Sequence, residues 1–187
     1  MTSPLEIAAV VLALATVACN IREIHWGWPL AIVSSLMYVV IFGKSKLYGD
    51  ASLQVFFAVV GLWGWYQWLR GHRSDGSQLH VARLKPRGVV LTVIASAVLW
   101  PVTGWFLAHY TDTDVPWWDA FPTALSVVGQ FLLGRKFIEN WAVWVGVNVV
   151  SVALFAYKGL WLTSGLYAVF IVLSFVGWRE WKARLAA

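Results

Sequence analysis

The sequence predicts an all-α integral membrane protein with seven transmembrane helices in a 3+1+3 arrangement. Of its 187 residues, 60% are hydrophobic and only 12% are charged, and the mean hydropathy is +0.69. Soluble domains carry about 25% charged residues, so these few charges could not cover a water-soluble core of this size. The apolar runs are continuous rather than alternating, which favours membrane helices over barrel strands. An internal repeat then predicts how the helices are grouped.

Seven apolar segments are candidates for the helices, because a membrane helix needs about 17–25 mostly apolar residues. In chain order they cover residues 4–19, 28–42, 51–69, 88–109, 120–134, 141–157 and 162–178. The connector 70–87 is rich in glycine, serine and charged residues and is the best linker. The first segment lacks a basic region in front of it and contains Glu6, so we expect a retained helix rather than a cleaved signal peptide.

The repeat appears when residues 28–68 are placed against residues 141–181 without a gap. Ten of 41 positions are identical, including a shared Gly-Trp-x-x-Trp at Gly64 and Gly177. The predicted units are a first three-helix repeat (1–70), a second with a short cytoplasmic tail (119–187), and an intervening segment (71–118). That segment holds a cytoplasmic loop, a linker helix and an outer loop. A unit of three helices ends on the opposite side of the membrane from its start, and the linker helix brings the chain back. The second repeat therefore enters the membrane in the same direction as the first, and the two repeats are parallel, as in several transporters.

The basic residues predict the orientation. The N-terminal face of a seven-helix chain would carry only three of the 14 lysines and arginines, and the other face would carry eleven. Cytoplasmic loops are enriched in these residues, so we expect the N-terminus outside and the C-terminus in the cytoplasm. The net charge of +5 then reports topology and does not indicate a nucleic-acid partner.

Several chemistries lack the residues that they require. The predicted helices carry no Asp, Glu, Lys or Arg near their middle, which argues against an ion-coupled pump. Gly43-Lys44-Ser45 lacks the earlier glycine and strand of a phosphate-binding loop. The sequence shows neither a metal-ligand spacing nor a nucleophile–base pair. We therefore expect a passive or gated pathway, with no catalytic residue, metal or cofactor.

One helix offers groups that could bind a flat ligand. Trp141, Trp144 and Asn148 follow the spacing i, i+3 and i+7, which predicts one helix face. Indole faces stack on rings and attract cations, and an amide both donates and accepts hydrogen bonds. Asn140 precedes this face. The alternative is that the tryptophans anchor the helix at the membrane interface, which suits Trp141 better than Trp144.

Other polar residues within the predicted helices are candidates for ligand binding or for helix packing. Gln54 and Gln130 are candidate ligand groups, as is Tyr167, which occupies the repeat position of Gln54. Thr123 and Ser126 are expected to bond to their own backbone. The tryptophans at the predicted cytoplasmic helix ends are expected to form an interface belt; they are Trp65, Trp68, Trp178 and Trp181.

These residues together resemble the PnuC-type transporters over nearly the whole chain. The first half matches in Gly27-Trp28-Pro29, in the run from Leu47 to Gln54, and in Gly64-Trp65-Tyr66-Gln67-Trp68. The second half matches in Asp119-Ala120, Thr123, Ser126, Lys136, Glu139-Asn140-Trp141, Trp144, Asn148, Leu166-Tyr167 and Gly177-Trp178. The resemblance implies two three-helix bundles joined by one helix and assembled as a homotrimer in the bacterial inner membrane.

The resemblance also implies a function. PnuC-type proteins import nicotinamide riboside by facilitated diffusion, and a cytoplasmic kinase traps it by phosphorylation. The implied substrate-binding residues are Trp141, Trp144, Asn148 and Asn140, with Gln54, Gln130 and Tyr167. Similar proteins take thiamine or riboflavin, so these stay open as substrates. A substrate-binding subunit of an ATP-driven vitamin importer is a further alternative, although such subunits have six helices and no parallel repeat.

Overall fold

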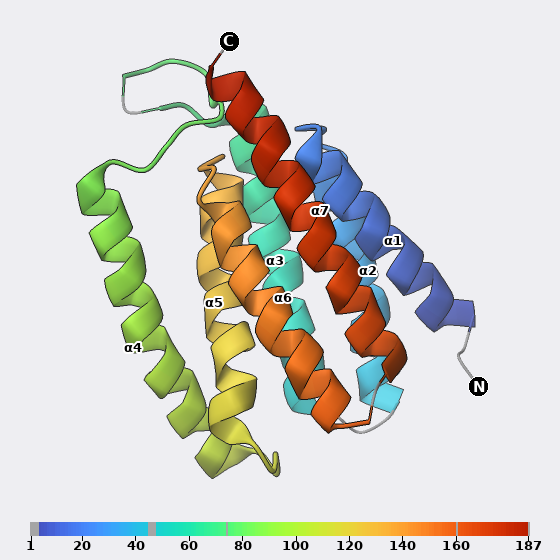
Figure 1. The fold of residues 1–187 in the computed structure, drawn as a ribbon. Helices are drawn as coiled ribbons and strands as arrows, with labels where there is room; N and C mark the ends of the chain where they lie inside the picture. The colour runs from blue at the N-terminus through green and yellow to red at the C-terminus, as the bar shows by residue number, and fades with distance from the viewer. Residues whose placement is uncertain (1–3, 45–47, 74, 160, 187) are drawn as a thin grey trace. The chain divides into compact units, whose positions relative to one another are not determined.

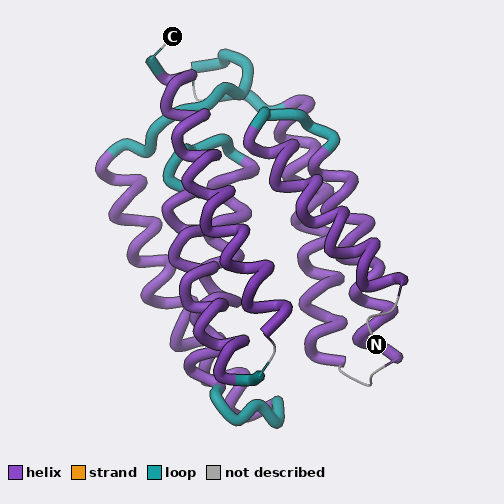
Figure 2. Tube along the Cα trace, turned by 45° about the vertical axis from the view of Figure 1, so that its right-hand side comes forward, coloured by secondary structure: helices purple, strands orange, loops and turns teal. Residues whose placement is uncertain are grey.

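A computed structural model describes residues 4–44, 48–73, 75–159 and 161–186, without the side chains of 4–6, 41–44, 48–53 and 162. Seven helices occupy the described residues, with loops at their ends (Figures 1 and 2). They are α1 (Pro4–Ile21), α2 (Gly27–Lys44), α3 (Tyr48–Arg70), α4 (Pro86–Tyr110), α5 (Pro116–Gly134), α6 (Asn140–Tyr157) and α7 (Trp161–Leu185). Leu47 and Leu160, an identical pair of the repeat, lie outside the described residues.

The helix bounds follow the predicted apolar runs, with two informative differences. Helix α7 continues to Leu185, past the predicted end at residue 178, because Arg179, Glu180 and Lys182 extend it as good helix formers. Hydropathy does not detect such a polar end. Helix α5 begins at Pro116, four residues before the predicted start, with its proline in the first turn, where a missing N–H costs nothing.

The chain forms two compact units, Met1–Leu79 and His80–Ala187. In the first unit, α2 packs against both α1 and α3, and the hydroxyl of Ser34 donates a hydrogen bond to the carbonyl of Ala9 at 3.1 Å. In the second unit, α5 packs against α4 and α6, and α6 packs against α7 (Figure 1). Neighbouring helices are therefore packed together in each unit, and in the first unit a buried hydrogen bond also links α2 to α1.

Each unit contains the same arrangement of tryptophan and glycine. In the first unit the Trp28 indole lies on Gly64 and meets Trp68 edge to face, with ring centroids 5.7 Å apart. In the second unit Trp141 lies on Gly177 and meets Trp181 in the same way, at 5.4 Å. Glycine is required at these positions because an added β-carbon would overlap the indole ring. The identities found in the sequence therefore correspond to equivalent helix contacts.

Helix α4 differs from the other helices of its unit. Its apolar side chains are largely exposed, including Leu91 at 66% and Val93 at 62%. By length and composition, α4 and α6 are the helices among the described residues that could cross a membrane. An exposed apolar helix is unfavourable in water, so this surface suits the hydrocarbon of a lipid bilayer.

The connector before α4 is held down rather than free. Leu79 and Val81 are buried. The amide of Ala82 donates to the carbonyl of Lys136 at 3.0 Å, and the amide of Ile138 donates to the carbonyl of Ala82 at 3.0 Å. Leu84 N–H donates to Oε2 of Glu139 at 3.1 Å. The predicted linker therefore ends in an extended segment attached to the turn between α5 and α6.

Candidate functional site

The three residues of the predicted α6 face, Trp141, Trp144 and Asn148, do not all contact the same neighbouring helix. Trp141 is 3% exposed and faces α7, where a β-carbon on Gly177 would lie 2.5 Å from its ring. Asn148 also faces α7, and its Nδ2 donates to Oγ of Ser174 at 3.4 Å. Trp144 instead faces α5, because a β-carbon on Gly129 would lie 3.2 Å from its ring. The predicted face therefore divides between the α6–α7 contact and the α5–α6 contact.

Two predicted amides present buried oxygens without a hydrogen-bond partner among the described residues. One is Oε1 of Gln130 on α5. The other is Oδ1 of Asn140, whose Nδ2 donates to the carbonyl of Phe137 at 2.6 Å. Leaving a buried acceptor unpaired costs about 1–3 kcal/mol. Both oxygens could therefore gain from a donor on a ligand.

Tyr167 and Gln54 occupy different surroundings. Tyr167 on α7 lies in an aromatic cluster, with ring centroids 5.0 Å from Phe155 and 5.7 Å from Phe170. Gln54 lies on α3 in the first unit and is half-buried. The second unit thus brings Asn140, Trp141, Trp144 and Asn148 onto one helix, with Gln130 and Tyr167 on its two neighbours.

The expected interface belt is wrong for Trp181. This residue is 0% exposed, because its ring is enclosed against Trp141. Trp68 likewise packs against Trp28. Helix-end position suggested anchoring, but helix packing covers the Trp181 ring completely. The prediction for Thr123 is confirmed, since its hydroxyl donates to the carbonyl of Asp119 at 2.9 Å.

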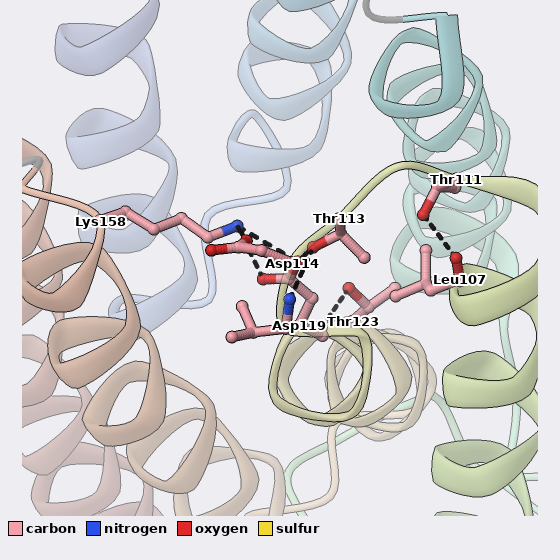
Figure 3. A network of polar contacts seen from close by, with 8 residues as sticks. Leu107, Thr111, Thr113, Asp114, Asp119, Thr123 and Lys158 are labelled. Carbon is pink, nitrogen blue, oxygen red and sulfur yellow. Dashed lines mark hydrogen bonds and ion pairs between the residues drawn. The ribbon is translucent and has the colours of Figure 1, made fainter.

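The sequence reasoning missed a charged cluster at the end of the second unit where α5 and α7 begin. Lys158 Nζ lies 3.2 and 3.3 Å from the two carboxylate oxygens of Asp119 and 3.9 Å from Asp114 (Figure 3). The Thr113 hydroxyl also donates to Asp119. In the sequence, Asp119 and Lys158 stand at the ends of predicted helices and Asp114 stands in a connector, but no local pattern pairs residues that are 39 positions apart.

The fold and the candidate site can now be compared with those of known proteins. A family model described as nicotinamide mononucleotide transporter matches residues 3–183. A match over nearly the whole chain defines the class of protein as a membrane transporter. The chain belongs to the nicotinamide mononucleotide transporter family, the family of PnuC-type vitamin transporters.

Individual relatives differ in the vitamin that they are named for. The nicotinamide riboside transporter PnuC of Escherichia coli (strain K12) is 27% identical, over 80% of this chain and 73% of that protein. The riboflavin/roseoflavin transporter RibM of Streptomyces davaonensis is 31% identical, over 93% and 82%. The crystal structure of the vitamin B3 transporter PnuC shares the fold, with a TM-score of 0.76 and 24% identity over 94% of this chain and 79% of that one.

Proposed function

We propose that this protein carries nicotinamide riboside across the bacterial inner membrane by facilitated diffusion. The observation that carries the proposal is its membership of a family in which the PnuC of Escherichia coli is a nicotinamide riboside transporter. Accumulation would then depend on phosphorylation of the riboside in the cytoplasm. The helices support a passive route, because the runs 120–134, 141–157 and 162–178 contain no charged residue that could relay ions.

The substrate contacts that we propose in the second unit come from α5, α6 and α7. Trp144 would stack on the pyridinium ring, since an indole face attracts a flat cation. The free oxygens of Gln130 and Asn140 would accept from the carboxamide or ribose, and Asn148 and Tyr167 would add polar contacts. In the first repeat, Gln54 at the repeat position of Tyr167 is the candidate substrate contact. Trp141 would support the site by fixing α6 against α7, because its ring is already covered by Gly177 and Trp181.

The arrangement that we propose keeps the 3+1+3 scheme. Residues 1–70 and 119–187 would be parallel three-helix repeats, joined through 71–118, which contains α4. The equivalent tryptophan–glycine contacts of the two units support this grouping. The eleven-to-three split of basic residues supports an outer N-terminus and a cytoplasmic C-terminus. A homotrimer is proposed from the PnuC resemblance, and native mass spectrometry in detergent would test it.

A ligand panel on the purified protein tests the substrate. Nicotinamide riboside should quench tryptophan fluorescence with micromolar or tighter affinity and should equilibrate into sealed liposomes without ATP. Thiamine, riboflavin and free nicotinamide are the comparison ligands. Binding of one of the other vitamins without the riboside would reject the substrate proposal. Uptake that requires added ATPase subunits would reject facilitated diffusion.

Riboflavin is the second candidate, and one observation favours it. RibM, a riboflavin/roseoflavin transporter, is 31% identical over 93% of this chain. Riboflavin is also a flat ring system with a polar chain, so the same indole and amides could bind it. Unlike the riboside, it is uncharged, and its binding would therefore depend less on the cation–π contribution of Trp144.

Two variants separate ligand binding from helix packing. Trp144→Ala and Asn148→Ala should each weaken riboside binding by about tenfold, as expected for loss of one stacking or hydrogen-bonding partner of about 1.4 kcal/mol. Ser174→Ala is the matched control for Asn148, because it removes the same interhelical hydrogen bond and leaves the amide in place. Equal losses in Asn148→Ala and Ser174→Ala would assign Asn148 to packing alone.

A further inference from the structure

The charged cluster of Figure 3 joins the start of α5 to the end of α6. Asp114 lies in the connector after α4, Asp119 lies in the first turn of α5, and Lys158 caps the end of α6. Next to the ion pair, the rings of Trp118 and Tyr157 lie 5.4 Å apart. The start of α5 and the turn between α6 and α7 are therefore held together by one polar and one aromatic contact.

From these contacts we propose that Lys158 and Asp119 form an ionic latch, which keeps this end of the second unit closed and opens when cargo passes. The inference rests on the proposed transport function, and it assigns these two residues a gating role in it. The pair is partly shielded, with 20% of the Asp119 side chain and 30% of the Lys158 side chain exposed. Solvent therefore still reaches both charges, and the pair can separate without burying either.

Each partner keeps a favourable position when the pair separates. Asp119 lies in the first turn of α5, where the helix dipole favours a negative charge, and Lys158 lies at the C-terminal end of α6, where it favours a positive charge. The Thr113 hydroxyl also donates to Asp119. A latch whose two halves remain stabilised when apart can open and close repeatedly.

The start of α5 also has a point at which it can bend. Pro122 lies inside the helix and lacks an N–H, so the carbonyl of Trp118 does not receive the usual helical hydrogen bond. The segment that carries Asp119 thus precedes a proline, where helices commonly kink. On the other side, Gly159 has a φ of +72°, and it closes a tight turn directly after Lys158. One partner is therefore on a segment that can pivot, and the other lies at the C-terminal end of a different helix.

Opening can be measured without any substrate. In a Cys19→Ser background, the variant Thr123→Cys, one turn from Asp119, reports access to this end through its rate of maleimide labelling. Lys158→Met and Asp119→Asn should each raise this rate about three- to fivefold, which is the effect of losing one partly exposed ion pair. Lys182→Met, at an exposed position on α7, is the control and should leave the rate unchanged.

A charge exchange and a transport assay complete the test. Lys158→Asp combined with Asp119→Lys should restore much of the slow labelling, although each charge then opposes its helix dipole, and Lys158→Arg should label slowly. Riboside uptake into liposomes should change in rate for the two single variants, with unchanged binding affinity. Labelling of both single variants at the control rate, or an exchange that labels as fast as they do, would overturn the latch. Absence of riboside uptake in the unmodified protein would reject the transport proposal instead, because the labelling result does not depend on substrate.

Discussion

At the scale of single residues, the tryptophans have two distinct kinds of surroundings. Trp28 and Trp141 are buried against glycines and against a second tryptophan, and they join helices within their units. Trp144 also covers a glycine, Gly129, but this contact is on α5, and Trp144 is only partly buried. A partly exposed indole face can receive a ring, so we propose a ligand contact for Trp144 and a packing role for Trp141.

The packing role of Trp141 gives a prediction for Gly177. Gly177→Ala should destabilise the protein by about 1–3 kcal/mol, because the new methyl group overlaps a rigid ring in a closely packed contact. Thermal unfolding in detergent measures the change. Gly165→Ala on the same helix is the control, since its β-carbon would meet nothing within 4 Å. Equal unfolding temperatures for the two variants would show that the Trp141 contact is not tight.

At the scale of elements, the connector between α3 and α4 is the segment that the sequence describes least well. Its composition indicates a flexible linker, yet residues around Ala82 pair with the α5–α6 turn, and Glu139 accepts the amide of Leu84. The partners in that last contact are 55 residues apart. No local pattern marks such a pairing.

Glu139 should control how often this connector opens. Glu139→Ala removes the acceptor for Leu84 and should speed trypsin cleavage after Arg83 about fivefold, which corresponds to about 1 kcal/mol. Glu139→Gln keeps an acceptor oxygen and should cleave more slowly than Glu139→Ala. Glu180→Ala, at an exposed position, controls for the loss of a negative charge. If the alanine variants at 139 and 180 are cleaved at the same rate, the side-chain bond does not hold the connector.

At the scale of the whole molecule, membrane embedding follows from family membership and is consistent with the surface of α4. This helix packs against α5 and exposes apolar side chains along its length. Such a surface has no stabilising role in water, whereas lipid hydrocarbon covers it without cost.

A lysine placed on α4 should therefore reduce membrane insertion more strongly the deeper it lies in the bilayer. Ile94→Lys, near the middle of the helix, should reduce membrane insertion by about 2.5–3.5 kcal/mol, the cost of a central lysine. Val89→Lys, near the helix start, should cost much less because its side chain can reach the interface. Both positions are exposed, at 53% and 42%, so packing is matched. Measured insertion efficiencies that are equal at the two positions would contradict a transmembrane α4.

The sequence by itself determined the seven helices, their approximate bounds, the internal repeat and the family resemblance. These depend on local composition and on residue identities, which a linear pattern records fully. The tertiary structure decided that Trp181 is buried, that Trp141 and Trp144 face different helices, and that Glu139 holds the connector. It also paired Lys158 with Asp119. Each of these depends on contacts between residues distant in the chain, and helix rotation and packing, which bring them together, leave no signature in any single segment.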